Sequence, residues 1–147
     1  MQSFFHKIDA LKFGWNDRPL DEVAFNKLTR KLKIKVKSMP LAVNGFYSCV
    51  KGRHFIAVDS RLSSLQAEFV MYHELAHFIM HSPSRDSIDN YCGSPTNSRD
   101  EKEADAFAYC AVLPLTMLKK VELEDLSDMY GSSFLMRRLE VYERYGI

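Results

Sequence analysis

Segment 73–77, with the sequence HELAH, constrains the fold more than any other part of the chain. Its two histidines are four residues apart, so on an α-helix they lie about 40° apart around the axis and one turn along it. Both imidazoles can therefore reach one metal ion, and Glu74 is placed to hold a water molecule and accept its proton. Since a catalytic zinc site has a third protein ligand and an open position, a second segment must pack against this helix.

The next histidine along the chain cannot complete such a site. His73 and His81 are eight residues apart, which separates them by about 12 Å along a straight helix. Ligand bonds of about 2 Å exclude a metal ion shared by these two side chains. We expect His81 to lie at the end of the helix, where a histidine interacts favourably with the helix dipole.

Acidic residues further along the chain are better candidates for the third ligand. Glu101 and Asp105 are spaced i, i+4 and share one helix face with Ala104 and Ala108. Small residues on this face allow the helix to approach the HELAH helix closely. In this arrangement Glu101 binds the metal, and Asp105 orients a ligand histidine through its other ring nitrogen.

Two other interpretations of these residues remain open. Glu103 points about 200° away from Glu101 on the same helix, so only one of the two can face the metal. Glu101 is the preferred ligand and Glu103 is the alternative. Glu101 also fits a structural role, because Ser98 and Glu101 match a capping box at the start of a helix.

Periodicity predicts the elements of the first half of the chain. A helix is expected to begin near Pro19, with Asp17 as its cap. Strict alternation of lysine and apolar residues over 31–37 indicates a half-buried strand. Two more strands, over 45–50 and 54–58, flank a short turn and form a hairpin.

The second half of the chain is predicted to be mainly helical. Ser63 and Gln66 form a capping box at the start of the HELAH helix. The polar segment 82–97 is expected to be a loop. A third helix is predicted from about 99 to 112, and the last thirty residues are predicted to form two short helices broken at 130–133.

This order of elements predicts an α+β fold, organised as a single domain over residues 1–147. A small sheet of three strands or slightly more, containing antiparallel pairs, packs against the HELAH helix and the C-terminal helices. Strand 54–58 directly precedes the HELAH helix, and its edge is a candidate for pairing with an extended substrate. The candidate donors to a reaction oxyanion are Tyr72, His81, Tyr91 and Tyr109.

Composition narrows the setting of the protein. The formal net charge is +1, which gives no reason to expect nucleic acid or an anionic membrane as a partner. No apolar run approaches the roughly 20 residues of a membrane span, and the N-terminal residues lack a signal-peptide core. The three cysteines contain no CxxC pair, as expected for a reduced protein. We therefore expect a cytoplasmic protein that contacts neither nucleic acid nor a membrane.

Together, two sequence patterns resemble the ImmA/IrrE-type metallopeptidases. The first is the HELAH segment, and the second is ExEADxFAxxxxLP over residues 101–114. Segment 126–133 also resembles the closing helix-turn-helix-like segment of that family. The resemblance covers roughly residues 45–140, and Ala76 stands where the family usually has glycine, which is a mild departure.

The resemblance implies a small gluzincin-like, zincin-type fold with one zinc ion, or manganese in its place, at the histidines and the acidic residue identified above. It implies a zinc-dependent endopeptidase that cleaves a DNA-binding transcriptional repressor, with Glu74 as general base. Since residues 1–44 lack a clear two-helix DNA reader, we expect the repressor to be a separate chain.

Two other functions compete with this one. The first is a non-cleaving, metal-binding regulatory module that sequesters a regulator. The second is a deformylase-like amide hydrolase, which shares only HExxH; its cysteine ligand motif is not visible around Cys49. The appearance of cleaved substrate, and its suppression by a chelator, distinguishes an enzyme from a binding module.

Overall fold

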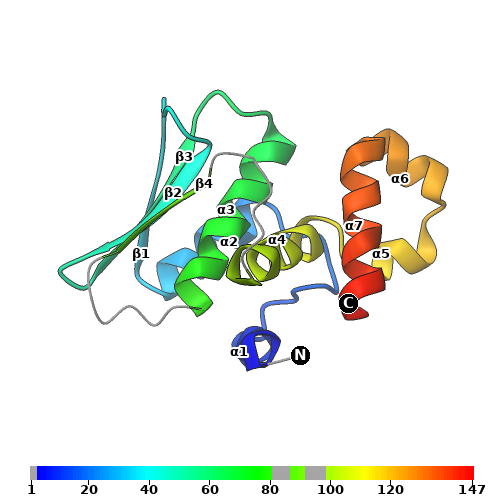
Figure 1. Cartoon of the computed structure of the whole chain (residues 1–147), viewed down its shortest axis with the longest axis horizontal. Coiled ribbons are helices and arrows are strands. Elements are labelled where there is room, and N and C mark those ends of the chain that lie inside the picture. Colours follow the sequence, from blue (N-terminus) through cyan, green and yellow to red (C-terminus); the bar gives the residue numbers. More distant parts are fainter. Residues whose placement is uncertain (1–2, 81–86, 92–98) are drawn as a thin grey trace.

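The computed structural model describes residues 3–80, 87–91 and 99–147 of the chain (Figure 1). Within these ranges the strands are β1 (Ile34–Met39), β2 (Gly45–Val50), β3 (Arg53–Asp59) and β4 (Ser87–Tyr91). The helices are α1 (Ser3–Leu11), α2 (Glu22–Lys31), α3 (Ser64–Met80), α4 (Arg99–Val112), α5 (Leu115–Lys120), α6 (Leu123–Tyr130) and α7 (Ser132–Tyr145). The chain is therefore α+β, as predicted.

The described strands form one mixed sheet in the order β1-β3-β2-β4. β1 is parallel to β3, whereas β2 is antiparallel to both β3 and β4. β3 is therefore an interior strand with a neighbour on each side. The prediction that strand 54–58 offers a free edge to a substrate is wrong, because the backbone groups on both sides of β3 already pair with other strands.

The polar segment after α3 contains a strand that periodicity did not indicate. β4 pairs with β2 from Gly45 opposite Tyr91 to Cys49 opposite Ser87. Strand pairing is made by backbone hydrogen bonds, so an edge strand does not need the apolar alternation of a half-buried strand. The prediction of an uninterrupted loop over 82–97 is wrong over β4; residues 82–86 and 92–97 lie outside the described residues.

Helices cover one face of the sheet (Figure 1). α3 packs against β2 and β3, α2 packs against β1, and α4 packs against α3. α5, α6 and α7 follow α4 and lie on the side of α4 away from the sheet (Figure 1). α3 is thus placed between the sheet and α4, and this position puts the HELAH segment in the interior. No helix in the described ranges has the length and apolar character needed to cross a membrane.

Local signals located most helix ends, with one difference at the start of α2. The Ser63–Gln66 capping box is present, with Gln66 N donating to Ser63 Oγ at 3.3 Å. The prediction of Asp17 as the cap of α2 is wrong: Asp21 is the cap, and its carboxylate accepts a hydrogen bond from Ala24 N at 2.9 Å. The Asp17 amide instead donates to Gly14 O within a turn.

The two ends of the chain also contain helices that were not predicted. α1 has no acidic residue in its first turn and no basic residue in its last, so local sequence signals are weak. It is stabilised by packing, since Phe5 and Ile8 are buried. α5 was also not predicted, whereas the predicted break between the last two helices lies at Gly131, whose φ of +89° suits glycine.

One buried cation connects the C-terminal helices to the rest of the chain. Arg138 on α7 is fully buried, and its guanidinium donates to Leu113 O, to Ile147 O at 2.9 Å and to Asn16 Oδ1 at 3.1 Å. The same Asn16 oxygen accepts a hydrogen bond from Leu115 N at 2.8 Å. We call these residues the Arg138 cluster. It joins the segment before α2, the end of α4 and the end of the chain.

Candidate metal centre

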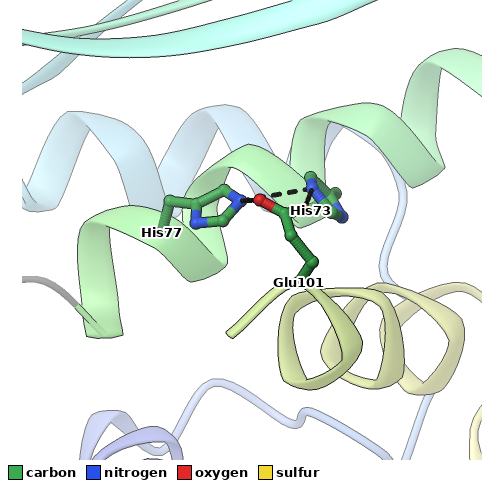
Figure 2. A group of neighbouring side chains, drawn as sticks. All are labelled: His73, His77 and Glu101. Atoms are coloured by element: carbon green, nitrogen blue, oxygen red, sulfur yellow. Dashed lines mark hydrogen bonds and ion pairs between the residues drawn. The ribbon is translucent and has the colours of Figure 1, made fainter. Parts of the chain in front are cut away.

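Three ligand-type side chains meet between α3 and the first turn of α4 (Figure 2). The Nε2 atoms of His73 and His77 lie 3.2 Å apart. The Glu101 carboxylate bridges them, with Oε2 at 3.0 Å from His73 Nε2 and Oε1 at 3.1 Å from His77 Nε2. Among the described residues, only this group of three or more His, Cys, Asp or Glu side chains offers ligand atoms this close together.

The spacing of these atoms fits the ligand set of one metal ion. In a tetrahedral zinc site with bonds of about 2.0–2.1 Å, neighbouring ligand atoms lie roughly 3.3 Å apart. The three observed separations are 3.0–3.2 Å. Two imidazoles and one carboxylate are also ligands that zinc and manganese accept. The residues present therefore fit one such ion, with room in the ligand set for a fourth position.

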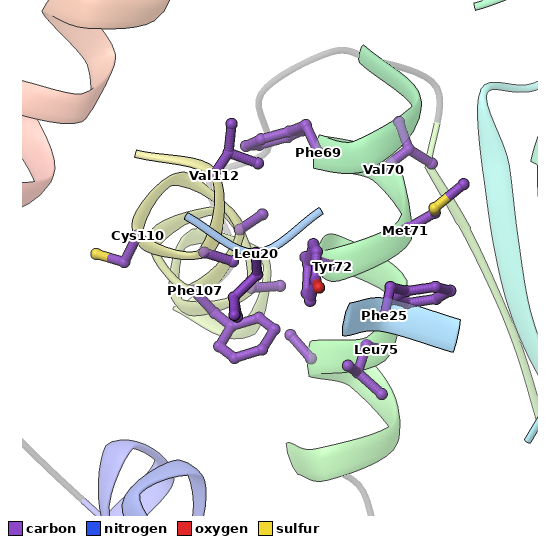
Figure 3. Packing of buried hydrophobic residues seen from close by; sticks show 14 of the residues in the cluster. Leu20, Phe25, Phe69, Val70, Met71, Tyr72, Leu75, Phe107, Cys110 and Val112 are labelled. Atoms are coloured by element: carbon purple, nitrogen blue, oxygen red, sulfur yellow. The ribbon is translucent and has the colours of Figure 1, made fainter. Parts of the chain in front are cut away.

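Packing between α3 and α4 holds this group in place (Figure 3). Every residue of α3 from Phe69 to His77 is buried. Tyr72 projects from α3 towards α4, and the rings of Tyr72 and Phe107 lie 6.1 Å apart. A helix that is buried on every side contains polar residues only where partners compensate them. His73 and His77 are therefore maintained in the core by α4.

The close approach of α4 follows from its small residues. Ala104 and Ala108 are fully buried, as expected for small side chains at a tight helix contact. Glu101 lies one turn before Asp105 on this helix, so both carboxylates reach α3. Asp105 Oδ1 lies 2.8 Å from His73 Nδ1, on the side of the ring opposite Nε2. This contact orients the imidazole so that Nε2 points towards Glu101 and His77.

The charges at this site perturb each other strongly. Burial lowers the pKa of His73, but hydrogen bonds to Asp105 and Glu101 outweigh it and raise this pKa to about 9. Burial also acts to raise the pKa of Glu101. The contacts of its carboxylate with His73 and His77 are stronger and hold this pKa well below its usual range. Without a metal ion, a proton on His73 therefore supplies the positive charge that these carboxylates require.

Glu74 is fully buried beside the two histidines. Its negative charge is one of the influences that raise the pKa of His73. Gly45 at the start of β2 approaches this part of α3: a Cβ at Gly45 would lie 3.8 Å from Glu74 Cγ and 2.5 Å from Val70 Cγ1. The strand therefore forms a tight wall behind Glu74.

Glu103, the alternative ligand, lies elsewhere on α4. Its Oε1 is 3.4 Å from Arg99 Nε, one turn earlier on the same helix. It is not part of the group formed by the histidines and Glu101. The structure thus favours Glu101 over Glu103 at this position. The predicted capping partner of Glu101, Ser98, lies outside the described residues.

The candidate oxyanion donors are separated by the fold. The Tyr72 hydroxyl donates to Asp21 O at 3.1 Å within the core, so it is committed to packing. Tyr109 is half-buried and lies on α4 one turn after Asp105. His81 and the side chain of Tyr91 lie outside the described residues. Tyr109 is therefore the candidate whose position is compatible with a role near the site.

A cleft beside the metal centre was not foreseen from the sequence. Its volume is about 840 Å³, and Asp105 forms part of its wall. Its lining also includes Phe69, Tyr109, Ser133, Phe134 and Arg137. We call this the aromatic cleft. Its walls come from α3, α4 and α7, so no single sequence pattern could have indicated it.

Comparison with known proteins agrees with the fold and the residue group. Residues 29–144, about four fifths of the chain, match the protein family described as the IrrE N-terminal-like domain, which is a peptidase family. This match includes α3, α4 and every residue of the candidate metal centre. Searches of curated proteins and of solved structures returned no match. The chain therefore belongs to the IrrE N-terminal-like peptidase family.

Proposed function

We propose that this chain is a metal-dependent endopeptidase that hydrolyses a peptide bond in a specific protein, a separate DNA-binding transcriptional repressor. The observation that supports a hydrolase most directly is the convergence of His73, His77 and Glu101 within 3.0–3.2 Å, next to the buried Glu74. The repressor as substrate is supported by the resemblance to ImmA/IrrE-type metallopeptidases.

In this proposal His73, His77 and Glu101 hold one zinc ion, or a manganese ion in its place. When bound, the ion would act as a Lewis acid that makes water acidic and polarises the scissile carbonyl. Asp105 keeps the His73 ring oriented through Nδ1. This contact fixes the direction of Nε2 without using a ligand position.

Glu74 performs the proton transfers. Its carboxylate accepts a proton from the attacking water and then delivers it to the leaving amine. Complete burial suits this role, because it keeps the carboxylate away from bulk solvent. An apolar side chain could fill this space, so the presence of an ionisable carboxylate at Glu74 agrees with a chemical role.

We also propose a cytoplasmic location. The described cysteines, Cys49 and Cys110, are buried free thiols. Free thiols are usual in a reducing compartment, where disulfides are rare. A transcriptional repressor would be accessible to the protein in that compartment.

The Glu74→Gln variant tests the mechanism. We expect this variant to retain one metal ion per chain and to lose at least 100-fold in cleavage rate, since general bases contribute about that much or more. The assay is fragment formation from a panel of purified helix-turn-helix repressors, with metal content measured on the same sample. A chelator should abolish cleavage by the wild-type protein.

The possible outcomes separate the competing functions. Undiminished cleavage by the Glu74→Gln variant would exclude this residue as the base. A repressor that binds the metal-loaded wild-type chain and stays intact would favour the sequestering module. Cleavage that persists after complete metal removal would rule out a metallopeptidase.

A further inference from the structure

The aromatic cleft lies next to the metal centre and shares a residue with it. Asp105 lines the cleft and also contacts His73 Nδ1 at 2.8 Å. In an extended peptide, consecutive residues are spaced by about 3.3 Å. A substrate with its scissile bond at the metal centre would therefore place a neighbouring residue at the mouth of this cleft.

The walls of the cleft are made of packed aromatic rings. The Tyr109 ring lies 4.6 Å from that of Phe69 and 4.9 Å from that of Phe134. Tyr130 stacks on Phe134 with the ring centres 5.5 Å apart. Phe69 is buried, whereas Tyr109 and Phe134 are only partly buried and so present ring surface to the cleft. This surface is preformed for an apolar side chain with a broad face.

Polar groups surround this apolar surface. Ser133 and Arg137 of α7 are exposed and line the cleft. The Arg137 charge also acts on the Tyr109 hydroxyl. Burial, together with the charge of Asp105, nevertheless raises the pKa of Tyr109 to about 12. The polar groups of the cleft therefore include hydroxyl and guanidinium donors, which suit the carbonyl groups of a peptide backbone, beside the Asp105 carboxylate.

The size of the cleft suits this use. Its volume of about 840 Å³ lies within the roughly 300–1,000 Å³ typical of ligand sites. It is large enough for one bulky side chain together with the adjacent backbone.

We propose that the aromatic cleft is a substrate specificity site that takes a large apolar side chain, aromatic or leucine-like, next to the scissile bond. Phe134 and Ser133 of α7 are then specificity-determining residues, although they lie far along the sequence from the HELAH segment. This inference rests on the proposed peptidase function, which it deepens by defining the class of substrate residue.

The test measures binding separately from cleavage. The probes are fluorescein-labelled peptides Ala-Ala-X-Ala-Ala, with X as Phe, Leu, Ala or Lys. They are titrated into the metal-loaded Glu74→Gln protein and followed by fluorescence anisotropy. We expect the Phe and Leu peptides to bind about tenfold or more tightly than the Ala peptide, because the cleft buries most of a large apolar side chain.

Two substitutions in the same background test the named residues. Ser133→Trp fills the cleft from an exposed position and should remove the preference for Phe over Ala. Phe134→Ala removes one aromatic wall and should reduce that preference several-fold; Ser133→Trp covers the case in which Phe134→Ala does not fold. Met136→Ala is the matched control, since Met136 is on the same helix and is 63% exposed. Metal content should be unchanged in all three.

Different measurements test the specificity site and the peptidase function: peptide affinity tests the first, and cleavage tests the second. Equal affinity for the Phe and Ala peptides, or a preference that survives Ser133→Trp, would overturn the specificity site. If the preference is present and disappears in Ser133→Trp, the site stands even where the wild-type protein cleaves no peptide. In that case it is the proposed endopeptidase activity that fails.

Discussion

The metal centre and the Arg138 cluster both place charge in the interior, but they balance it in different ways. The Arg138 guanidinium donates to three acceptors, namely Leu113 O, Ile147 O and the Asn16 side-chain oxygen. At the metal centre, two imidazoles and a carboxylate crowd together within 3.0–3.2 Å. In the Arg138 cluster the guanidinium supplies the positive charge itself. At the metal centre, the carboxylates require a positive charge from a metal ion or from a proton on His73.

This difference separates a buried polar group that supports the fold from one that binds a ligand. Backbone carbonyls around Arg138 satisfy a fixed charge and connect distant segments. The metal centre, by contrast, holds groups whose protonation is adjustable, with His73 shifted upwards and Glu101 downwards in pKa. These opposed shifts follow from the contact of His73 with Glu101, and perturbed groups of this kind cluster at functional sites.

The largest expected effect is the loss of metal in Glu101→Ala. Removal of this carboxylate leaves two histidines as ligands, and the metal affinity should fall by more than the roughly 10–100-fold that outer contacts cost. Glu103→Ala is the matched control, since Glu103 lies on the same helix and pairs with Arg99. The measurement is metal per chain after dialysis, with circular dichroism to verify folding. Loss of metal in Glu103→Ala alone would reverse our ligand assignment.

The next largest effect should be the destabilisation caused by Arg138→Ala. This substitution leaves the Leu113 carbonyl and the Asn16 side chain without their buried partner. We expect a loss of about 3 kcal/mol in the free energy of unfolding. Urea denaturation of the metal-free protein measures it. Folded protein should still bind one metal ion, so a loss of metal binding at full stability would contradict the separation of the two regions.

The metal-free protein should lose stability as the pH rises from about 6.5 through 9. The pKa of His73 is about 9 in the folded chain, above its ordinary value of 6.5. A raised pKa of a base contributes stability that is fully present below the unfolded value and disappears above the folded value. The expected loss is on the order of 3 kcal/mol.

Denaturation midpoints at several pH values measure this loss. Asp105→Asn weakens the contact that raises the His73 pKa and should flatten the profile. A wild-type profile without a slope between pH 6.5 and 9 would show that His73 does not hold the compensating proton. The Arg138 cluster should contribute nothing to this slope, because an arginine stays protonated throughout the range.

The smallest expected effect concerns the wall behind Glu74. In Gly45→Ala, the new Cβ would meet Val70 Cγ1 at 2.5 Å and Ala57 O at 2.9 Å. β2 and α3 must then separate slightly, which should cost about 1–2 kcal/mol of stability and move Glu74. We expect cleavage to fall by about tenfold while metal content is retained. Unchanged cleavage kinetics would show that the base tolerates this displacement.

Much of the site could be predicted because its spacing is local to two helices. The i, i+4 pairs His73–His77 and Glu101–Asp105 define helix faces without reference to the rest of the fold. The bounds of α4 and the capping box of α3 also follow from neighbouring residues. These features depend on helix geometry, and helix geometry is the same in every context.

Relations between distant segments could not be read in this way. The interior position of β3 depends on its parallel pairing with β1, on the side opposite β2, and this pairing uses backbone groups that every residue carries. The same holds for the aromatic cleft, since Phe134 meets Tyr109 only because α7 folds back beside α4.

The sequence by itself determined the chemistry of this protein: two histidines, a base and an acidic partner, at spacings that a helix converts into faces. Tertiary structure alone decided which face of α4 meets α3, and so brought Glu101 to the histidines and left Glu103 with Arg99. The packing of whole elements also determined which acceptors surround Arg138 in the Arg138 cluster and which side chains line the aromatic cleft. Periodicity defines the direction of a side chain within its own element, whereas the partner it meets depends on how whole elements pack.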